Sequence, residues 1–164
     1  MTSYTVYVDG ACTNNGRPNA KAGYGAILTN PQGDTLELAA PLPSGDRQTN
    51  QRAELMAALT ALTRCKAGSP ITLISDSQYV IKGINEWMPG WKARGWKNSD
   101  KKTPDHLDLW LLVDAQLQLK EVTPMWVRGH TGVPGNERAD TLANLGAAGQ
   151  RVEKRIPAPV LDPA

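Results

Sequence analysis

Four acidic residues occupy positions from which their carboxylates could act together. Asp9 closes the apolar segment of residues 5–8, and Asp76 directly follows the apolar segment of residues 71–75. β-Branched and aromatic residues in such segments predict strands. A carboxylate at the end of an apolar strand is costly unless a positive group lies against it. We therefore consider a shared cation site formed by Asp9, Glu54, Asp76 and Asp140.

The chemistry of such a site would be that of hard divalent cations. Carboxylate oxygens without an accompanying cluster of Cys or His suit Mg²⁺ or Mn²⁺ better than Zn²⁺. Four carboxylates close together repel one another unless cations neutralise them. Two ions held in this way stabilise the attacking and the leaving oxygen of an in-line phosphoryl displacement. The alternative is that each acid is an ordinary helix-cap or surface residue, and spacing alone does not separate the two interpretations.

The composition is that of a folded protein with a local concentration of positive charge. The chain has 164 residues, 40% of them apolar, and a net charge of +2. These values suit a globular domain and exclude a disordered chain. Between Lys92 and Lys102 there are five basic residues and one acidic residue. Cys12 and Cys65 do not form a disulfide framework or a zinc-ligand spacing, so both are predicted to be free thiols.

No part of the sequence resembles a targeting segment or a membrane span. The N-terminal residues lack a basic segment followed by an apolar one, and no apolar run approaches the length that crosses a bilayer. We therefore expect a cytoplasmic protein without a membrane partner. We also expect a monomer.

Strands are expected in five segments. Three of them predict an antiparallel meander, with coil at residues 10–22 and a turn at residues 30–33. These three are residues 4–9, 23–29 and 34–40. Two more strands are expected at residues 71–75 and 122–127. If the strands at 4–9 and 71–75 are neighbours, Asp9 and Asp76 project from the same edge of one sheet.

Helices are expected where apolar residues recur at helical spacing. They cover residues 50–66, 77–95, 105–120 and 134–148, and Pro89-Gly90 is expected to interrupt the second. Glu54 lies one turn into the first helix and Asp140 lies within the last. The element order predicts an α/β fold with a mixed five-stranded sheet, three strands antiparallel and the others parallel, flanked by helices. One domain at residues 1–149 precedes a loose Pro-rich tail at residues 150–164.

Five blocks of sequence stand out along this framework. Four of them are YVDGAC at 7–12, QTNQRAEL at 48–55, ISDSQYV at 74–80 and RGHTGVPGNERAD at 128–140. The chain resembles type 1 ribonuclease H in these blocks, and NEWMPGWKARGWK at 85–97 is similar to the basic, Trp-rich protrusion of that family. The resemblance spans residues 4–148. It implies a ribonuclease H-like fold and Mg²⁺-dependent endonucleolytic cleavage of the RNA strand of RNA/DNA hybrids, leaving 5′-phosphate and 3′-hydroxyl ends.

The same resemblance implies roles for individual residues. The four acids named above become the ligands of two Mg²⁺ ions, with Mn²⁺ as a substitute. His130 assists proton transfer or product departure, and Asn136, in the motif that joins His130 to Asp140, is a further substrate-site residue. His130 lies between glycines in a loop, and histidine is the residue type that is generally suited to a proton shuttle. The alternative is a solvent-exposed loop histidine without a role.

A hybrid-selective enzyme must sense the 2′-hydroxyls of one strand and their absence from the other. Side-chain amides suit the 2′-hydroxyl because it both donates and accepts hydrogen bonds. The candidates are Asn14, Asn15, Asn50, Gln51 and Gln78. The alternative for loop Asn and Gln residues is turn chemistry.

The DNA strand is expected to lie along the Trp-rich segment. Aromatic rings interleaved with cations suit a nucleic-acid groove, and this pattern comprises Trp87, Trp91, Lys92, Arg94 and Lys97. Trp87 and Trp91 share a face at helical spacing. Trp96 and Trp110 are instead expected to pack the protrusion onto the body. By resemblance, Tyr79 and Trp87 line the DNA channel, and Arg47 and Thr49 bind a DNA phosphate, which positions the duplex without reading its sequence.

Two features depart from the family pattern. Other members tend to carry Asn at the position of His106, where it completes the phosphate pocket, so the phosphate contact here is expected to vary with pH. The first loop, residues 13–22, is longer than in bacterial members and more like that of eukaryotic ones. Two other functions stay open: a nuclease of the same fold that acts on DNA, and a catalytically silent hybrid-binding module. Metal-dependent turnover of a substrate would distinguish an enzyme from the hybrid-binding module.

Overall fold

An antiparallel meander forms the first half of the sheet in the computed structural model of the chain, which describes residues 3–160. Its strands are β1 (Tyr4–Thr13), β2 (Lys21–Thr29) and β3 (Thr35–Pro41). The meander was predicted, but the coil expected at 10–22 is wrong at both ends. β1 and β2 stay paired as far as Thr13 opposite Lys21, so only residues 14–20 connect them.

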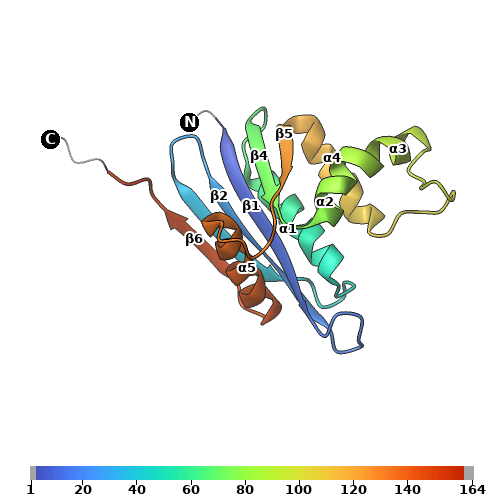
Figure 1. Cartoon of the computed structure of the whole chain (residues 1–164), viewed down its shortest axis with the longest axis horizontal. Coiled ribbons are helices and arrows are strands. Elements are labelled where there is room, and N and C mark those ends of the chain that lie inside the picture. The colour runs from blue at the N-terminus through green and yellow to red at the C-terminus, as the bar shows by residue number, and fades with distance from the viewer. Residues whose placement is uncertain (1–2, 161–164) are drawn as a thin grey trace.

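The other half of the sheet is parallel to β1. β4 (Pro70–Ser75) pairs with β1, and β5 (Glu121–Trp126) pairs with β4. The strand order is β5-β4-β1-β2-β3-β6 (Figure 1). The expected neighbours β1 and β4 are therefore paired, with Val8 opposite Ser75. Asp9 follows Val8 within β1, and Asp76 follows the last residue of β4, so the two acids lie near each other where β4 ends.

The sheet has six strands and not the five that the sequence predicted. β6 (Val152–Ile156) pairs antiparallel with β3, so the expected loose tail is wrong for these residues. Their side chains are mostly exposed and charged, which conceals the strand from hydrophobic patterning. The strand forms because β3 offers an unpaired row of backbone groups. Arg64 adds an ion pair to Glu153 at 2.7 Å, while residues 161–164 of the predicted tail lie outside the described part.

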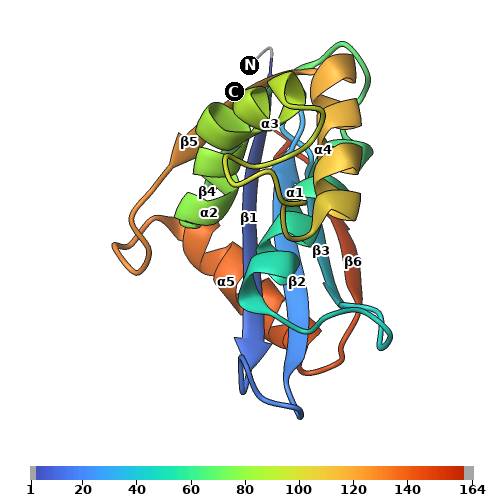
Figure 2. The ribbon, with the colours of Figure 1, turned by 90° about the vertical axis from the view of Figure 1, so that its right-hand side faces the viewer.

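Helices cover both faces of this sheet (Figures 1 and 2). The helical elements are α1 (Asn50–Arg64), α2 (Gln78–Lys82), η1 (Gly83–Trp87), α3 (Met88–Ala93), α4 (Leu107–Leu119) and α5 (Pro134–Ala147). α1 and α5 both contact β1 and β2, and they lie on opposite faces. Of the helices within residues 3–160, none is long and apolar enough to span a membrane.

The interruption predicted at Pro89-Gly90 takes the form of a π-helical turn and not a break. η1 ends at Trp87, two residues before Pro89, and the backbone N–H of Met88 bonds to the carbonyl of Gly83, five residues earlier. A π turn accommodates an irregularity without ending the helix. Gly83 has no side chain, and a Cβ there would overlap the indole of Trp110.

Buried apolar side chains fill the space between α1 and the sheet. Val6, Leu62 and Leu73 belong to this core, and Trp110 is fully buried in a second cluster beside it. Trp96 packs against the second cluster, so the prediction that Trp96 and Trp110 attach the protrusion to the body is confirmed. Both cysteines are free thiols, as predicted.

Candidate active site

Asp9 is the centre of the carboxylate cluster. Its side chain is 5% exposed, and its Oδ1 accepts a hydrogen bond from the backbone N–H of Gly10 at 2.9 Å. Gly10 also decides how near α1 comes, because a Cβ at this position would overlap the backbone nitrogen of Glu54. The glycine that follows Asp9 within β1 therefore lets the helix that carries Glu54 lie against the strand that carries Asp9.

Asp76 lies beside Asp9 and is approached from two sides. The loop after β5 passes so close that a Cβ at Gly129 would lie 2.9 Å from Oδ2 of Asp76. From α5, the Nδ2 of Asn136 donates to Oδ2 of Asp76 at 3.3 Å. Asn136 is buried, and its Oδ1 is a buried side-chain oxygen without a hydrogen-bond partner among the described residues. The amide therefore has an acceptor available beside the acids.

Glu54 is held by a residue that the sequence did not single out. Ser77 Oγ donates to Oε2 of Glu54 at 2.6 Å and accepts from the backbone N–H of Val80 at 3.3 Å. Ser77 is thus both the N-cap of α2 and the partner of Glu54. Its position at the start of the helix predicted for residues 77–95 is the signal that could have found it, because Ser is favoured as an N-cap.

Asp140 reaches the cluster from the other face of the sheet. α5 lies close to β1 and β2 because Gly25 and Gly135 have no side chains at the points of contact with Leu142 and Tyr7. Asp140 is near enough to Asp9 to raise the pKa of the Asp9 carboxyl through a hydrogen bond and through charge repulsion.

Repulsion and burial make the cluster an unfavourable place for negative charge. Burial, the charge of Asp76 and the proximity of Asp140 raise the pKa of Asp9 to about 8, against the opposing hydrogen bond from Gly10. Burial and the charge of Asp76 also raise the pKa of Glu54, although Ser77 opposes this. Divalent cations would remove the conflict, and a set of oxygen donors fits them.

The acids do not form a complete metal site by themselves. Within residues 3–160, no group of three or more His, Cys, Asp or Glu side chains is placed to hold a metal ion. Mg²⁺ commonly uses one or two carboxylates and completes its coordination with water and substrate phosphate. The donor chemistry therefore fits ions that are shared with a bound phosphodiester. It does not resemble a closed structural metal site.

His130 lies in the loop that approaches Asp76. It is exposed, and its φ of 57° places it in the left-handed region next to Gly132, whose φ is 83°. The loop is bent by a hydrogen bond from Thr131 Oγ1 to the carbonyl of Arg128 at 2.7 Å. An exposed imidazole on such a loop can reach a substrate bound at the cluster.

Most of the predicted amides and the predicted phosphate ligands gather in one pocket. The pocket has a volume of about 400 Å³, and its lining includes Asn15, Arg47, Thr49, Asn50 and Gln51. Oδ1 of Asn15 accepts from the backbone N–H of Asn50 at 3.1 Å, which ties the first loop to α1.

Two predicted amides lie outside this pocket. Asn14 is exposed at the hairpin turn, where its φ is 54° and its carbonyl accepts from the N–H of Arg17. Asn14 therefore has a turn role. Gln78 is exposed at the start of α2.

A row of aromatic rings runs from α2 to α3. The centroids of Tyr79 and Trp87 are 5.7 Å apart, and those of Trp87 and Trp91 are 6.1 Å apart. The prediction that Trp87 and Trp91 share a face is confirmed. The hydroxyl of Tyr79 accepts from Nε1 of buried Trp110 at 3.0 Å, so the row is anchored to the core.

The three predicted cationic side chains near this row differ in their contacts. Lys92 forms an ion pair with Asp114 at 2.9 Å, and Lys97 donates to Oγ1 of Thr103 at 3.2 Å. Arg94 is exposed at the end of α3, where its guanidinium lies near Gly90. The ion pair with Asp114 partly neutralises the charge of Lys92, which the sequence pattern did not indicate.

The chain matches the RNase H family over residues 1–148. It belongs to the RNase H family. A ribonuclease H of Pseudomonas aeruginosa (strain LESB58) is 49% identical over 143 residues, covering 87% of this chain and 92% of that protein. A ribonuclease H of Cupriavidus metallidurans is 46% identical over 148 residues, covering 90% and 97%. The chain is therefore a hydrolase of the ribonuclease H class.

Solved structures agree with this assignment. LC9-RNase H1, a type 1 RNase H with the type 2 active-site motif, superposes with a TM-score of 0.80 at 25% identity, covering 96% of this chain and 78% of that one. A foamy viral protease-reverse transcriptase in complex with an RNA/DNA hybrid superposes with a TM-score of 0.73 at 26% identity, covering 89% of this chain and 20% of that one. The ribonuclease H-like fold predicted from the sequence is confirmed.

Proposed function

We propose that the chain cleaves the RNA strand of RNA/DNA hybrids by hydrolysis that depends on two Mg²⁺ ions. The observation that carries the proposal is the match to the RNase H family over residues 1–148, together with the meeting of Asp9, Asp76 and Asp140 at one site, where burial and neighbouring carboxylates raise the pKa of Asp9 to about 8. A cluster that so disfavours its own charge is suited to cations that arrive with an anionic substrate.

The residues divide the work as follows. Asp9 and Asp76 would hold both ions, with Asp140 on one of them and Glu54 on the other, and Glu54 would also contact a 2′-hydroxyl. When bound, such ions would activate the attacking water and neutralise the leaving oxygen. His130 delivers a proton to the leaving 3′-oxygen. Asn136 keeps Asp76 in place through the hydrogen bond at 3.3 Å. Mn²⁺ replaces Mg²⁺ at the same donors.

The two strands of the hybrid contact different parts of the surface. The RNA strand contacts the amides of Asn15, Asn50, Gln51 and Gln78. The DNA strand runs over the aromatic row from Tyr79 to Trp91, where base or sugar faces stack and nearby Lys and Arg residues attract the backbone. A DNA phosphate occupies the pocket with Arg47 and Thr49.

The experiment uses one oligonucleotide sequence in four forms: RNA/DNA hybrid, double-stranded RNA, double-stranded DNA and single-stranded RNA. Each is incubated with Mg²⁺ or with EDTA, beside the Asp9→Asn protein. We expect cleavage of the hybrid's RNA strand alone, only with metal, and activity of the variant below about 1% of wild type. Cleavage of DNA would show that the substrate is wrong, and binding of the hybrid without cleavage would show a binding module.

We also propose that the protein acts in the cytoplasm as a monomer. Free thiols at Cys12 and Cys65 suit a reducing compartment. Light scattering coupled to size-exclusion chromatography measures the mass in solution, and a dimer mass would contradict the proposal.

A further inference from the structure

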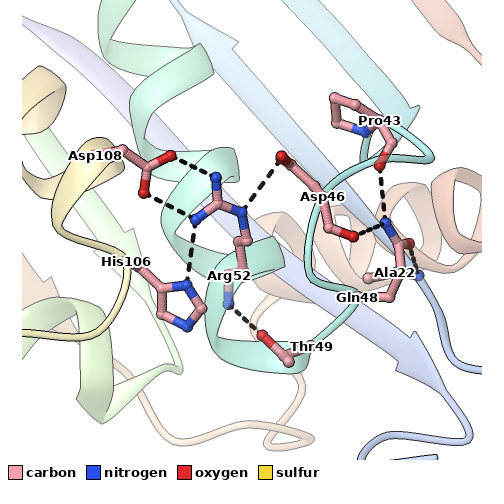
Figure 3. Close-up of polar contacts among 8 residues, drawn as sticks. All are labelled: Ala22, Pro43, Asp46, Gln48, Thr49, Arg52, His106 and Asp108. Carbon is pink, nitrogen blue, oxygen red and sulfur yellow. Dashed lines mark hydrogen bonds and ion pairs between the residues drawn. The ribbon is translucent and has the colours of Figure 1, made fainter. Parts of the chain in front are cut away.

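Arg52 joins three parts of the chain at the edge of the phosphate pocket (Figure 3). Its side chain is nearly buried, with 8% of it exposed. Nη1 and Nη2 donate to the two oxygens of Asp108 at 3.0 and 2.6 Å, and Nε donates to Asp46 at 3.2 Å. Arg52 thereby connects the start of α1 to the preceding loop and to the start of α4.

The remaining contact of this guanidinium is with His106. Nη1 of Arg52 lies 3.3 Å from Nδ1 of His106, whose residue is 6% exposed. Arginine stays protonated and has only donors, so Nδ1 of His106 has to accept. An imidazole that accepts at Nδ1 is neutral and carries its hydrogen on Nε2. The ion pairs with Asp46 and Asp108 hold the guanidinium in the plane that imposes this tautomer.

Nε2 lies on the side of the ring turned away from Arg52 (Figure 3). His106 lines the same pocket as Arg47 and Thr49. The backbone of His106 is in the left-handed region, with φ 59° and ψ 30°, and its carbonyl accepts from the N–H groups of Leu109 and Trp110. The backbone and the ring are therefore both held, and the pocket receives an N–H donor in a defined place.

We propose that Arg52 is a positioning residue that fixes His106 as its neutral Nε2–H tautomer, so that the pocket offers a phosphate an uncharged donor whose state does not follow pH. The proposal rests on the hybrid cleavage proposed above and adds how one phosphate is held. Arg47 supplies the positive charge, and His106 supplies a hydrogen-bond donor in a fixed orientation.

The charged groups around His106 are consistent with a neutral ring. Burial comes first among the causes that lower its pKa, and the cations of Arg47 and Arg52 add to it. Asp105 and Asp108 act in the opposite direction. Asp108 is already paired with Arg52, and Asp105 is an exposed residue 4.0 Å from Arg47. Tyr79 presents its ring to the imidazole at 6.4 Å between centroids. The proposal therefore predicts a phosphate contact that is constant with pH, whereas the sequence led us to expect one that varies with pH.

The first test is nitrogen NMR of the imidazoles, which needs no substrate. The chain has two histidines, so the His130→Ala protein assigns both. Between pH 6 and 8.5 we expect His106 to show a protonated Nε2 and a bare Nδ1 throughout. The Arg52→Gln protein is expected to lose this pattern, because an amide can also accept, and Arg52→Lys to retain it, because an ammonium only donates. A doubly protonated His106 at pH 6.5 in the wild type, or a hydrogen on Nδ1, overturns the proposal.

The second test is the KM for the hybrid relative to the His106→Asn protein, measured from pH 6 to 8.5. Asn does not titrate, so the ratio cancels the pH effects that both proteins share. We expect the ratio to stay constant within about twofold, because a charge-assisted hydrogen bond, roughly twice as strong as a neutral one, never forms. A steady change of about fivefold or more toward pH 6 overturns the proposal.

The two proposals fail in distinguishable ways. If the wild type cleaves no hybrid, the proposed function fails, while the NMR pattern of His106 still decides the tautomer. If the hybrid is cleaved but the KM ratio follows pH, the function stands and the inference fails. Arg52→Gln and Arg52→Lys are compared only as proteins with a native-like circular dichroism spectrum, so loss of folding is not mistaken for loss of the tautomer.

Discussion

Replacing Asp9 by Asn is expected to stabilise the metal-free protein while it abolishes catalysis. The pKa of Asp9 is about 8 in the fold, against a model value of 3.8 that we take for the unfolded chain. At pH 7 the Asp9 carboxyl is ionised in the unfolded chain, whereas in the folded protein it is mostly protonated. Folding therefore requires the uptake of a proton, which costs free energy at this pH. The difference corresponds to about 4 kcal/mol of unfolding free energy at pH 7. Asn keeps the acceptor for the Gly10 N–H and removes the charge.

The sign of the pH dependence follows from the raised pKa. Below about pH 4 the carboxyl is protonated in both states and costs nothing. As pH rises toward 8, the wild type loses stability relative to Asp9→Asn, at about 1.4 kcal/mol per pH unit. Groups with lowered pKa values, such as Glu37 and Asp108, respond in the opposite direction but are present in both proteins and cancel.

The assay is urea unfolding in EDTA at pH 4.5, 6 and 7.5, followed by circular dichroism. Asp100→Asn is the matched control, because it removes the same charge from an exposed position and is expected to change stability by less than about 0.5 kcal/mol. Mg²⁺ should reduce the difference in unfolding free energy between Asp9→Asn and the wild type, because it binds the wild-type carboxylates. An Asp9→Asn protein no more stable than wild type at pH 7.5 in EDTA would refute the reasoning.

Three further perturbations test parts of the structure around the site. Arg138→Ala removes the bidentate partner of buried Glu37, whose oxygens lie 2.7 and 2.8 Å from its nitrogens, and should lower the unfolding free energy by about 3 kcal/mol in urea melts; a loss below about 0.5 kcal/mol contradicts this. Ser77→Ala should raise the Mg²⁺ concentration for half-maximal cleavage and remove about 1 kcal/mol of stability as an N-cap, whereas Ser77→Thr should restore both. Ending the chain at Gln150 removes β6 and should lower stability by roughly 2 kcal/mol without altering kcat, and a changed kcat would link β6 to the site.

Local patterns were sufficient for much of the architecture. Apolar residues at helical spacing identified α1, α4 and α5, and the β-branched segments identified five strands. The acids were predicted to meet because parallel strands end at one edge of a sheet, and Val8 opposite Ser75 places Asp9 and Asp76 there. In each case the information lies within a few residues, where side-chain periodicity reports which face is buried.

The amino-acid sequence by itself determined the family, the four carboxylates and the strands and helices that carry them. Only the tertiary structure decided the sixth strand, the Ser77–Glu54 hydrogen bond and the tautomer of His106. β6 forms through backbone groups, which no side-chain pattern reveals. His106 and Arg52 are 54 residues apart and meet where the starts of α1 and α4 converge. A histidine's state depends on what lies against each of its nitrogens, and that is a property of the packed chain.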